Sequence, residues 1–291
     1  MKPAQFDYHR ARDVQGAVRL LSELGEDAKI IAGGQSLVAM MNFRLARPGH
    51  LVDVGGLNSL HYIREESDGL HIGALTTHHD VETGDLGADF AVLCEAMRWV
   101  GHYPIRTRGT VGGSIAHADA TAEWCLLAIL LDARIVVESV RGRRSIEAGS
   151  FFFGYYATDL AFDEMIVEIV FPNRAPHAAV TEFAERQGDF AIAAAAVSLD
   201  LDGVEVIGGR IALAGVGPTP VCSAAGEAVL AAGGTFADCA DAAAESLQLE
   251  DEGMFTVEYR RTLVRTLVAD ACSDALAGAE RGKFRAQGVT S

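Results

Sequence analysis

Apolar and polar residues follow two different rhythms along this chain, and the rhythm changes after Pro172. Before that point, short apolar runs typical of strands alternate with segments whose apolar residues recur at helical spacing. The clearest helix runs from Val14 to Leu24, and Gly25 follows it where glycine commonly ends a helix. The first part of the chain is therefore predicted to mix helices and strands. Strands are expected within 28–34, 50–57, 69–77 and 134–140, and further helices within 90–100 and 121–133.

The part of the chain after Pro172 begins with two long apolar segments, at 190–201 and 209–221, which are typical of strands in an antiparallel meander. Segments rich in alanine and leucine follow with helical spacing, at about 224–232, 237–247 and 257–277. We therefore expect two domains, at about 1–175 and 176–291. The fold class is predicted to be α+β, with a C-terminal antiparallel sheet that carries helices.

Length and charge narrow the class of protein. A chain of 291 residues with 49% hydrophobic content can bury a sizeable core and fits two domains. Its formal net charge of −16 repels phosphate backbones, so nucleic acid is not expected as a partner. The start, MKPAQFDYHR, lacks the apolar core of a signal peptide, and the longest apolar runs are shorter than the roughly 20 residues that span a bilayer. These features predict a cytoplasmic protein without a membrane span.

The sequence contains no local metal-binding or hydrolase motif. The adjacent pair His78 and His79, next to Asp80, has no further ligand residue at a spacing that would complete a metal site. A helix start or a loop is therefore preferred over a metal site. Ser114, with His117 and Asp119 nearby, lacks the G-x-S-x-G elbow of a hydrolase. No catalytic residue and no metal ligand is therefore predicted. The cysteines, which form no Cys-x-x-Cys pair and are expected to be reduced, buried thiols, are Cys94, Cys125, Cys222, Cys239 and Cys272.

Two glycine pairs carry the main candidate chemistry, in KIIAGGQSL at 29–37 and in RGTVGGSIAHAD at 108–119. Adjacent glycines permit a positive φ and leave no Cβ between backbone N–H groups and an anion. Side-chain donors follow or flank each pair, for example Gln35 and Ser36 after the first. Neither segment is a G-x-G-x-x-G or Walker A sequence, so an ordinary turn at a strand end explains each pair equally well. The spacing therefore leaves a phosphate cradle and a plain turn as alternatives.

Taken in order, the motifs of this chain resemble a known family. AGGQSL, IGALTTH, IRTRGTVGGSIAHADATAE, RQGDFA and LAGVGPTPV occur as they do in the FAD-binding medium subunit of the molybdenum hydroxylases, a family that includes carbon monoxide and xanthine dehydrogenases. The resemblance covers essentially the whole chain. It implies an FAD-binding domain of the vanillyl-alcohol-oxidase-like type, with two subdomains at about 1–55 and 56–175 and FAD between them. A C-terminal domain of the molybdenum-hydroxylase flavoprotein type follows.

The resemblance implies that both glycine segments surround the FAD diphosphate and the adjoining ribose and ribityl groups. Glu123 matches an acidic residue that hydrogen-bonds the cofactor, although a solvated residue in the first turn of a helix is the alternative. Ile166 and Phe190 match positions near the isoalloxazine, and each is also compatible with a core role. The implied cofactor-binding residues are Ile30, Ile31, Ala32, Gly33, Gly34, Gln35, Ser36, Leu37, Thr110, Val111, Gly112, Gly113, Ser114, Glu123, Ile166 and Phe190.

The resemblance also implies a place in a multi-subunit oxidoreductase. Substrate is oxidised at a molybdenum cofactor on a large partner subunit, and [2Fe–2S] clusters on a small subunit pass the electrons to FAD on this chain. The FAD is expected to be non-covalent and to reduce NAD, a quinone or dioxygen. The expected assembly is a dimer of heterotrimers, that is, a heterohexamer. A self-sufficient FAD-dependent oxidase and a non-catalytic assembly subunit are the alternatives.

Two features, a missing lysine and a cluster of arginines, each allow more than one interpretation. Some relatives carry a lysine about eight residues before the aspartate of DFA, where this chain has Thr181. A lysine stabilises an anionic reduced flavin, so its loss leaves the flavin potential and the acceptor undetermined. Arg186 is either its replacement or a residue of a surface ion pair. The basic cluster of Arg141, Arg143 and Arg144 is either a solvated turn or a docking point for an acidic partner.

Overall fold

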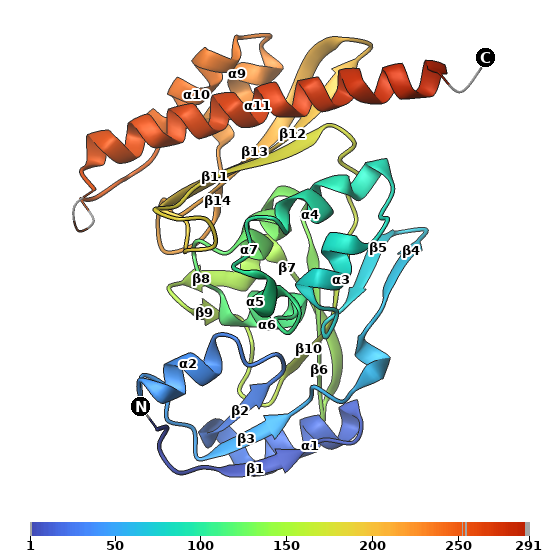
Figure 1. The fold of residues 1–291 in the computed structure, drawn as a ribbon, viewed down its shortest axis with the longest axis vertical. Coiled ribbons are helices and arrows are strands. Elements are labelled where there is room, and N and C mark those ends of the chain that lie inside the picture. Colours follow the sequence, from blue (N-terminus) through green and yellow to red (C-terminus); the bar gives the residue numbers. More distant parts are fainter. Residues whose placement is uncertain (1, 252, 254, 289–291) are drawn as a thin grey trace. The chain divides into compact units, whose positions relative to one another are not determined.

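The computed structural model of this chain describes residues 2–251, 253 and 255–288. The chain forms two compact units that interleave along the sequence (Figure 1). Unit 1 contains residues 1–81, 102–118 and 132–172, and unit 2 contains the remaining segments, 82–101, 119–131 and 173–291. The last crossing between the units, after Pro172, lies close to the boundary expected near residue 175. Two segments from the first half of the chain nevertheless belong to unit 2.

Unit 1 begins with a three-stranded parallel sheet in the order β1-β3-β2. Its strands are β1 (Asp7–Arg10), β2 (Ala28–Ile31) and β3 (His50–Asp53). The crossover helix α1 (Val14–Leu24) is capped by Asp13, whose side chain accepts from the Gly16 N–H, and it ends at Gly25 with a φ of 69°. A second helix, α2 (Leu37–Asn42), follows the first glycine pair. The first glycine pair therefore joins a strand to a helix.

The second sheet of unit 1 has five antiparallel strands in the order β4-β5-β10-β6-β7. Its strands are β4 (Ile63–Glu66), β5 (Gly69–Gly73), β6 (Arg134–Ser139), β7 (Gly142–Glu147) and β10 (Met165–Phe171). In β10 the register shifts between Ile166 and Glu168, which marks a bulge in the central strand. Further elements are α3 (His78–Thr83), where the chain passes into unit 2, α5 (Tyr103–Arg106), α6 (Val111–His117), α8 (Ala148–Phe151), β8 (Phe152–Gly154) and β9 (Ala157–Thr158).

Unit 2 is built on an antiparallel sheet in the order β11-β12-β13-β14. Helices α9, α10 and α11 pack on one face of this sheet, and α4 and α7 lie on the other (Figure 1). Because both faces are covered, β12 carries a continuous buried run from Ala193 to Val197 instead of alternating with polar residues. The elements are β11 (Ala178–Phe183), β12 (Ala193–Asp202), β13 (Glu205–Ala214), β14 (Val221–Cys222), α4 (Ala91–Ala96), α7 (Glu123–Leu130), α9 (Ala224–Ala231), α10 (Phe236–Glu245) and α11 (Val257–Gly288).

The predicted α+β class is confirmed, and most elements lie where the apolar spacing predicted them. The helix expected at 90–100 is shorter, because a 3₁₀ turn at Ala88–Phe90 precedes α4. The expectation that every cysteine is buried is wrong for Cys222, which is exposed, and for Cys94, which is partly exposed. In the described part of the chain, no helix has both the length and the apolar character needed to cross a membrane.

Candidate functional site

The first glycine pair lies in a loop that presents unpaired backbone donors. Gly34 has a φ of +73°, a conformation that residues with a side chain rarely adopt, and it turns the chain from β2 into α2. Within the described residues, the backbone N–H groups from Gly33 to Leu37 donate to no protein acceptor. Ser36 precedes α2 without capping it, and the Gln35 side-chain amide donates to the Gly33 carbonyl at 3.0 Å. A run of consecutive free N–H donors suits an anion such as a phosphate.

The second glycine pair is not an open loop, and this corrects the expectation. Thr110 caps α6 and accepts from the Gly113 N–H at 3.1 Å, so both glycines lie in the first turn of a helix. The N–H groups of Val111 and Gly112 donate to backbone carbonyls just before α3, at 3.0 and 2.9 Å. The amides expected to be bare are thus bonded within the protein. Glycine is needed for packing, because a Cβ on Gly112 would lie 2.6 Å from the Cβ of Ala74.

The two motifs meet within unit 1, although they are far apart in the sequence. A Cβ on Gly33 would lie only 1.9 Å from the carbonyl oxygen of Arg108 and 3.0 Å from the Cα of Gly109. Such an approach requires a residue without a side chain. Gly109 is held in turn by the N–H of His78, which donates to its carbonyl at 3.0 Å. The backbone of the second motif therefore packs directly against the first loop.

The charge pattern around these motifs favours an anionic ligand. The chain has 40 acidic residues, yet none lies between Asp27 and Asp53 or between Glu95 and Asp119. These are the two longest segments without an acidic residue, and each contains one glycine pair. A negative charge is expensive next to a phosphate, and these two stretches of sequence contribute none. The absence of acidic residues around each glycine pair is visible in the sequence, but it lies outside the motifs themselves.

The other three predicted site residues divide between the units. Ile166 is a buried residue of β10 in unit 1, at the bulge, which agrees with the core alternative and leaves its place beside the flavin a prediction. Glu123 is the first residue of α7 in unit 2; burial of its carboxyl group and the negative charge of Asp119 raise its pKa to about 7. Phe190, also in unit 2, is 76% exposed, so the core interpretation is wrong for this residue. Its ring is free to contact a ligand.

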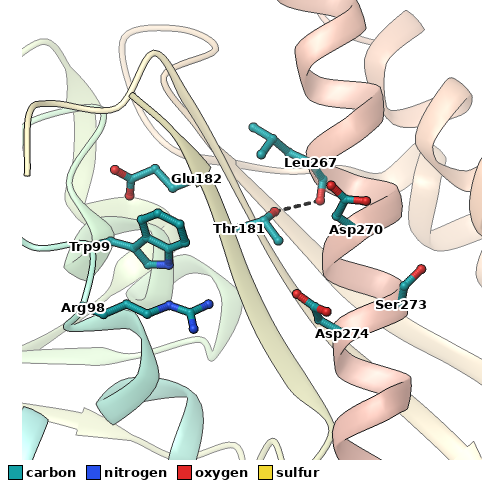
Figure 2. A pocket seen from close by; sticks show the side chains of 8 residues that line it. All are labelled: Arg98, Trp99, Thr181, Glu182, Leu267, Asp270, Ser273 and Asp274. Carbon is teal, nitrogen blue, oxygen red and sulfur yellow. Dashed lines mark hydrogen bonds between the residues drawn. The ribbon is translucent and has the colours of Figure 1, made fainter. Parts of the chain in front are cut away.

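Glu182 is a buried carboxyl group that the sequence reading missed. It lies on β11 with its side chain on the same side of the strand as Trp99, whereas its neighbour Thr181 points toward α11 (Figure 2). Among the described residues, Oε2 of Glu182 has no hydrogen-bond partner. Burial, with the nearby negative charge of Glu123, raises the pKa of Glu182 to about 9. The Thr181 hydroxyl donates to the Leu267 carbonyl at 2.8 Å, so it stabilises the fold and supplies no charge.

The histidine and arginine features have structural explanations. His78 is the first residue of α3, as the preferred interpretation held, and burial together with the positive charge of Arg106 lowers its pKa to about 4. All three residues of the arginine cluster form ion pairs, and their side chains remain 44–62% exposed, so neither the solvated turn nor the docking point is contradicted. Arg141 pairs with Asp163, Arg143 with Glu138, and Arg144 with Glu164 and Asp159. The pairs of Arg141 and Arg144 tie the β6–β7 hairpin to the segment after β9, whereas the Arg143–Glu138 pair lies within the hairpin.

Comparison with known protein families connects this geometry to a cofactor. Residues 4–174 match the family described as FAD binding domain in molybdopterin dehydrogenase. The chain belongs to this flavoprotein family. Residues 178–275 match a second family, the CO dehydrogenase flavoprotein C-terminal domain. The predicted resemblance and the predicted FAD cofactor are therefore confirmed, and the flavoprotein is an oxidoreductase component.

Individual relatives extend the similarity to the full length of the flavoprotein. It is 39% identical to the 6-hydroxypseudooxynicotine dehydrogenase complex subunit alpha of Paenarthrobacter nicotinovorans, over 95% of this chain and 96% of that protein. It is 34% identical to the carbon monoxide dehydrogenase medium chain of Afipia carboxidovorans, over 99% and 100% of the two chains. The structure of quinoline 2-oxidoreductase from Pseudomonas putida 86 superposes with a TM-score of 0.91 at 33% identity, over 96% and 99%.

We expect the FAD to be released from the flavoprotein by acid. A covalent link needs a nucleophilic His, Cys or Tyr side chain at the flavin ring, and the two residues that the resemblance places near the ring, Ile166 and Phe190, are not nucleophiles. Precipitation of the FAD-loaded protein with acid should leave the yellow colour in the supernatant. The check is flavin absorbance in supernatant and pellet. Colour that remains in the pellet after repeated washing with denaturant would contradict a non-covalent cofactor.

Proposed function

We propose that this chain is the electron-exit subunit of a molybdenum hydroxylase complex. In this proposal, a large subunit oxidises the substrate at its molybdenum cofactor, and a small subunit with [2Fe–2S] clusters delivers the electrons to this chain. An external acceptor, which is NAD, a quinone or dioxygen, then removes them. FAD, when bound, supplies this redox chemistry, and the chain binds and orients it. The complex is proposed to be a cytoplasmic dimer of heterotrimers.

The observation that carries this proposal is the extent of the similarity to medium subunits. Alignment with the Afipia carbon monoxide dehydrogenase medium chain covers all of that protein and 99% of this chain. Both chains thus span the same length, and that relative is one named subunit of a larger dehydrogenase. A self-sufficient oxidase needs its own site for an organic substrate. A medium subunit needs no such site, because the substrate is oxidised on another chain. The similarity to medium subunits therefore favours a complex in which one chain oxidises the substrate and this chain passes on the electrons.

The roles of the cofactor-binding residues are part of the proposal. The free N–H groups from Gly33 to Leu37 are proposed to bind the diphosphate, because they lack protein acceptors and lie in an acid-free segment. Residues 110–114 are proposed to support this loop and to offer the exposed backbone of Gly113, which has no side chain, to the cofactor. Glu123 is proposed to accept a hydrogen bond from a ribityl hydroxyl. Phe190 and Ile166 are proposed to flank the isoalloxazine ring.

We expect affinity purification of this chain from its native host to recover two further chains, one with molybdenum and one with iron–sulfur clusters. The complex should reduce its flavin when its substrate is added, whereas the isolated FAD-loaded chain should not. The isolated chain should retain weak NADH-dependent dye reduction if NAD is the acceptor, because electron transfer between NADH and flavin is reversible. Substrate-dependent flavin reduction by the chain alone would instead support the self-sufficient oxidase.

A further inference from the structure

A cleft in unit 2 crosses the edge of the four-stranded sheet (Figure 2). β11 is an edge strand of that sheet, and the cleft runs over it from the segment after α4 to α11, with a volume of about 410 Å³. A cleft of this size has room for on the order of ten water molecules, at about 30 Å³ each. The residues that line it are Arg98, Trp99, Thr181, Glu182, Leu267, Asp270, Ser273 and Asp274.

Glu182 connects this cleft to the interior of unit 2. It lines the cleft, yet it is only 9% exposed, and its Oε2 atom is buried without a hydrogen-bond partner among the described residues. Because its neighbour Thr181 points toward α11, the Glu182 side chain lies on the opposite face of β11, against which α4 packs. A buried carboxyl oxygen without a partner is costly, and the packing of the sheet does not explain it.

A second carboxyl group, that of Glu123, lies within electrostatic reach of Glu182. Burial, together with the negative charge of Glu123, raises the pKa of Glu182 to about 9. Glu123 begins α7 and is not one of the residues that line the cleft, and burial with the negative charge of Asp119 raises its own pKa to about 7. Carboxyl groups that interact in this way titrate as a pair. The pair therefore holds a proton near neutral pH, with Glu182 as its member at the cleft.

Reduction of FAD needs protons that the proposed electron donors do not carry. Iron–sulfur clusters deliver electrons alone, whereas FAD that accepts a pair of electrons also binds at least one proton. That proton has to come from solvent through the protein. A side chain transfers a proton efficiently when its pKa lies near the working pH and when it reaches the next group directly or through one water molecule. The raised pKa values of Glu182 and Glu123 meet the first condition, and the cleft admits water for the second.

We infer that Glu182 and Glu123 form a proton relay that carries protons from the cleft to the flavin. This inference rests on the proposed function above, which places Glu123 at a ribityl hydroxyl of FAD. The pair gives its proton to the reduced cofactor through Glu123, Glu182 passes its own proton to Glu123, and water in the cleft returns a proton to Glu182. The electrons come from the clusters and the proton from solvent. On the chain only O–H bonds break and re-form, so both carboxyl groups return to their starting state.

The charged residues at the mouth of the cleft have opposite effects on proton entry. Asp270 and Asp274 lie exposed on α11, and their carboxylates attract protons to the cleft. Arg98 is exposed on the other side of the cleft and opposes them with one positive charge. The acidic residues outnumber the arginine, so the mouth of the cleft favours protons over anions.

The test is to follow electron and proton separately in the FAD-loaded chain at pH 8. A photochemical one-electron donor imitates the clusters, since it supplies electrons alone; flavin absorbance then reports the electron, and a pH-indicator dye reports proton uptake from solution. Glu182→Gln should slow proton uptake about tenfold or more, with unchanged arrival of the first electron and unchanged FAD content. Glu182→Asp, which keeps a carboxyl group, should stay within about threefold of the unchanged protein. The matched control is Glu185→Gln, at an exposed position three residues away, which should not alter proton uptake.

A second variant tests the cleft without changing either glutamate. Ser273→Trp places a large side chain at an exposed position of the cleft wall and should also slow proton uptake. Unchanged uptake in this variant would show that protons enter elsewhere and would overturn the relay. Unchanged uptake in Glu182→Gln, or equal slowing by Glu182→Gln and Glu182→Asp, would overturn it as well. These measurements need no partner subunit, so failure of the chain to recover a molybdenum and an iron–sulfur chain overturns the proposed function by a separate result.

Discussion

The variant Gly33→Ala should lose at least 90% of its bound FAD. The added Cβ would lie 1.9 Å from the carbonyl oxygen of Arg108, far inside van der Waals contact, and that neighbour is backbone that cannot rotate away. The first loop must therefore move away from the second motif, and its free N–H groups no longer converge. We expect overpacking to destabilise the protein by on the order of 3 kcal/mol. A tenfold loss of affinity corresponds to about 1.4 kcal/mol.

The matched control is Gly149→Ala in α8, where an added Cβ meets no atom within 4 Å. Both glycines lie in unit 1, so the pair compares the same chemical change with and without a clash. The measurements are the flavin-to-protein ratio, the dissociation constant of FAD for the refolded apoprotein, and far-ultraviolet circular dichroism as a check on folding. Full flavin occupancy in a folded Gly33→Ala protein would show that close contact between the two motifs is not needed for FAD binding.

The variant Glu182→Gln should be more stable than the unchanged protein at pH 8 and about equally stable at pH 5. In the folded state, burial and Glu123 raise the pKa of Glu182 to about 9, whereas an unfolded glutamate titrates near 4.3. Between these values the folded state binds more protons than the unfolded state, so stability falls as pH rises. The loss approaches about 1.4 kcal/mol per pH unit within this window. Glutamine does not ionise and escapes this loss.

The expected gain is several degrees in melting temperature at pH 8, since about 1 kcal/mol shifts a chain of this size by roughly 2–4 °C. Thermal unfolding of the FAD-saturated protein should be recorded at intervals from pH 5 to pH 9. Glu185→Gln is the control, because it removes the same charge from an exposed position three residues away. If the stability difference between Glu182→Gln and the unchanged protein does not vary with pH, Glu182 is not held protonated by its surroundings.

The apolar spacing along the chain correctly predicted those helices and strands whose limits are set by residues nearby in the sequence. The helix Val14–Leu24 was bounded correctly because its apolar spacing, Asp13 cap and terminal Gly25 are all local features. The helix expected at 90–100 was too long, because apolar spacing continues through residues that form a 3₁₀ turn and further turns around α4. The α+β class and the FAD cofactor followed from ordered motifs that extend along the whole chain. These features are encoded in order and spacing.

The sequence by itself therefore determined the family, the cofactor, the fold class and the identity of the two glycine motifs. Tertiary structure decided how each motif works: the first keeps its N–H groups free, while the second gives its N–H groups to carbonyls near α3 and to its own Thr110 cap. It also decided that Gly33 rests on Arg108 and that Glu182 is buried. Backbone hydrogen bonding and burial depend on partners brought together from distant segments, and periodicity along the chain carries no information about which segments meet.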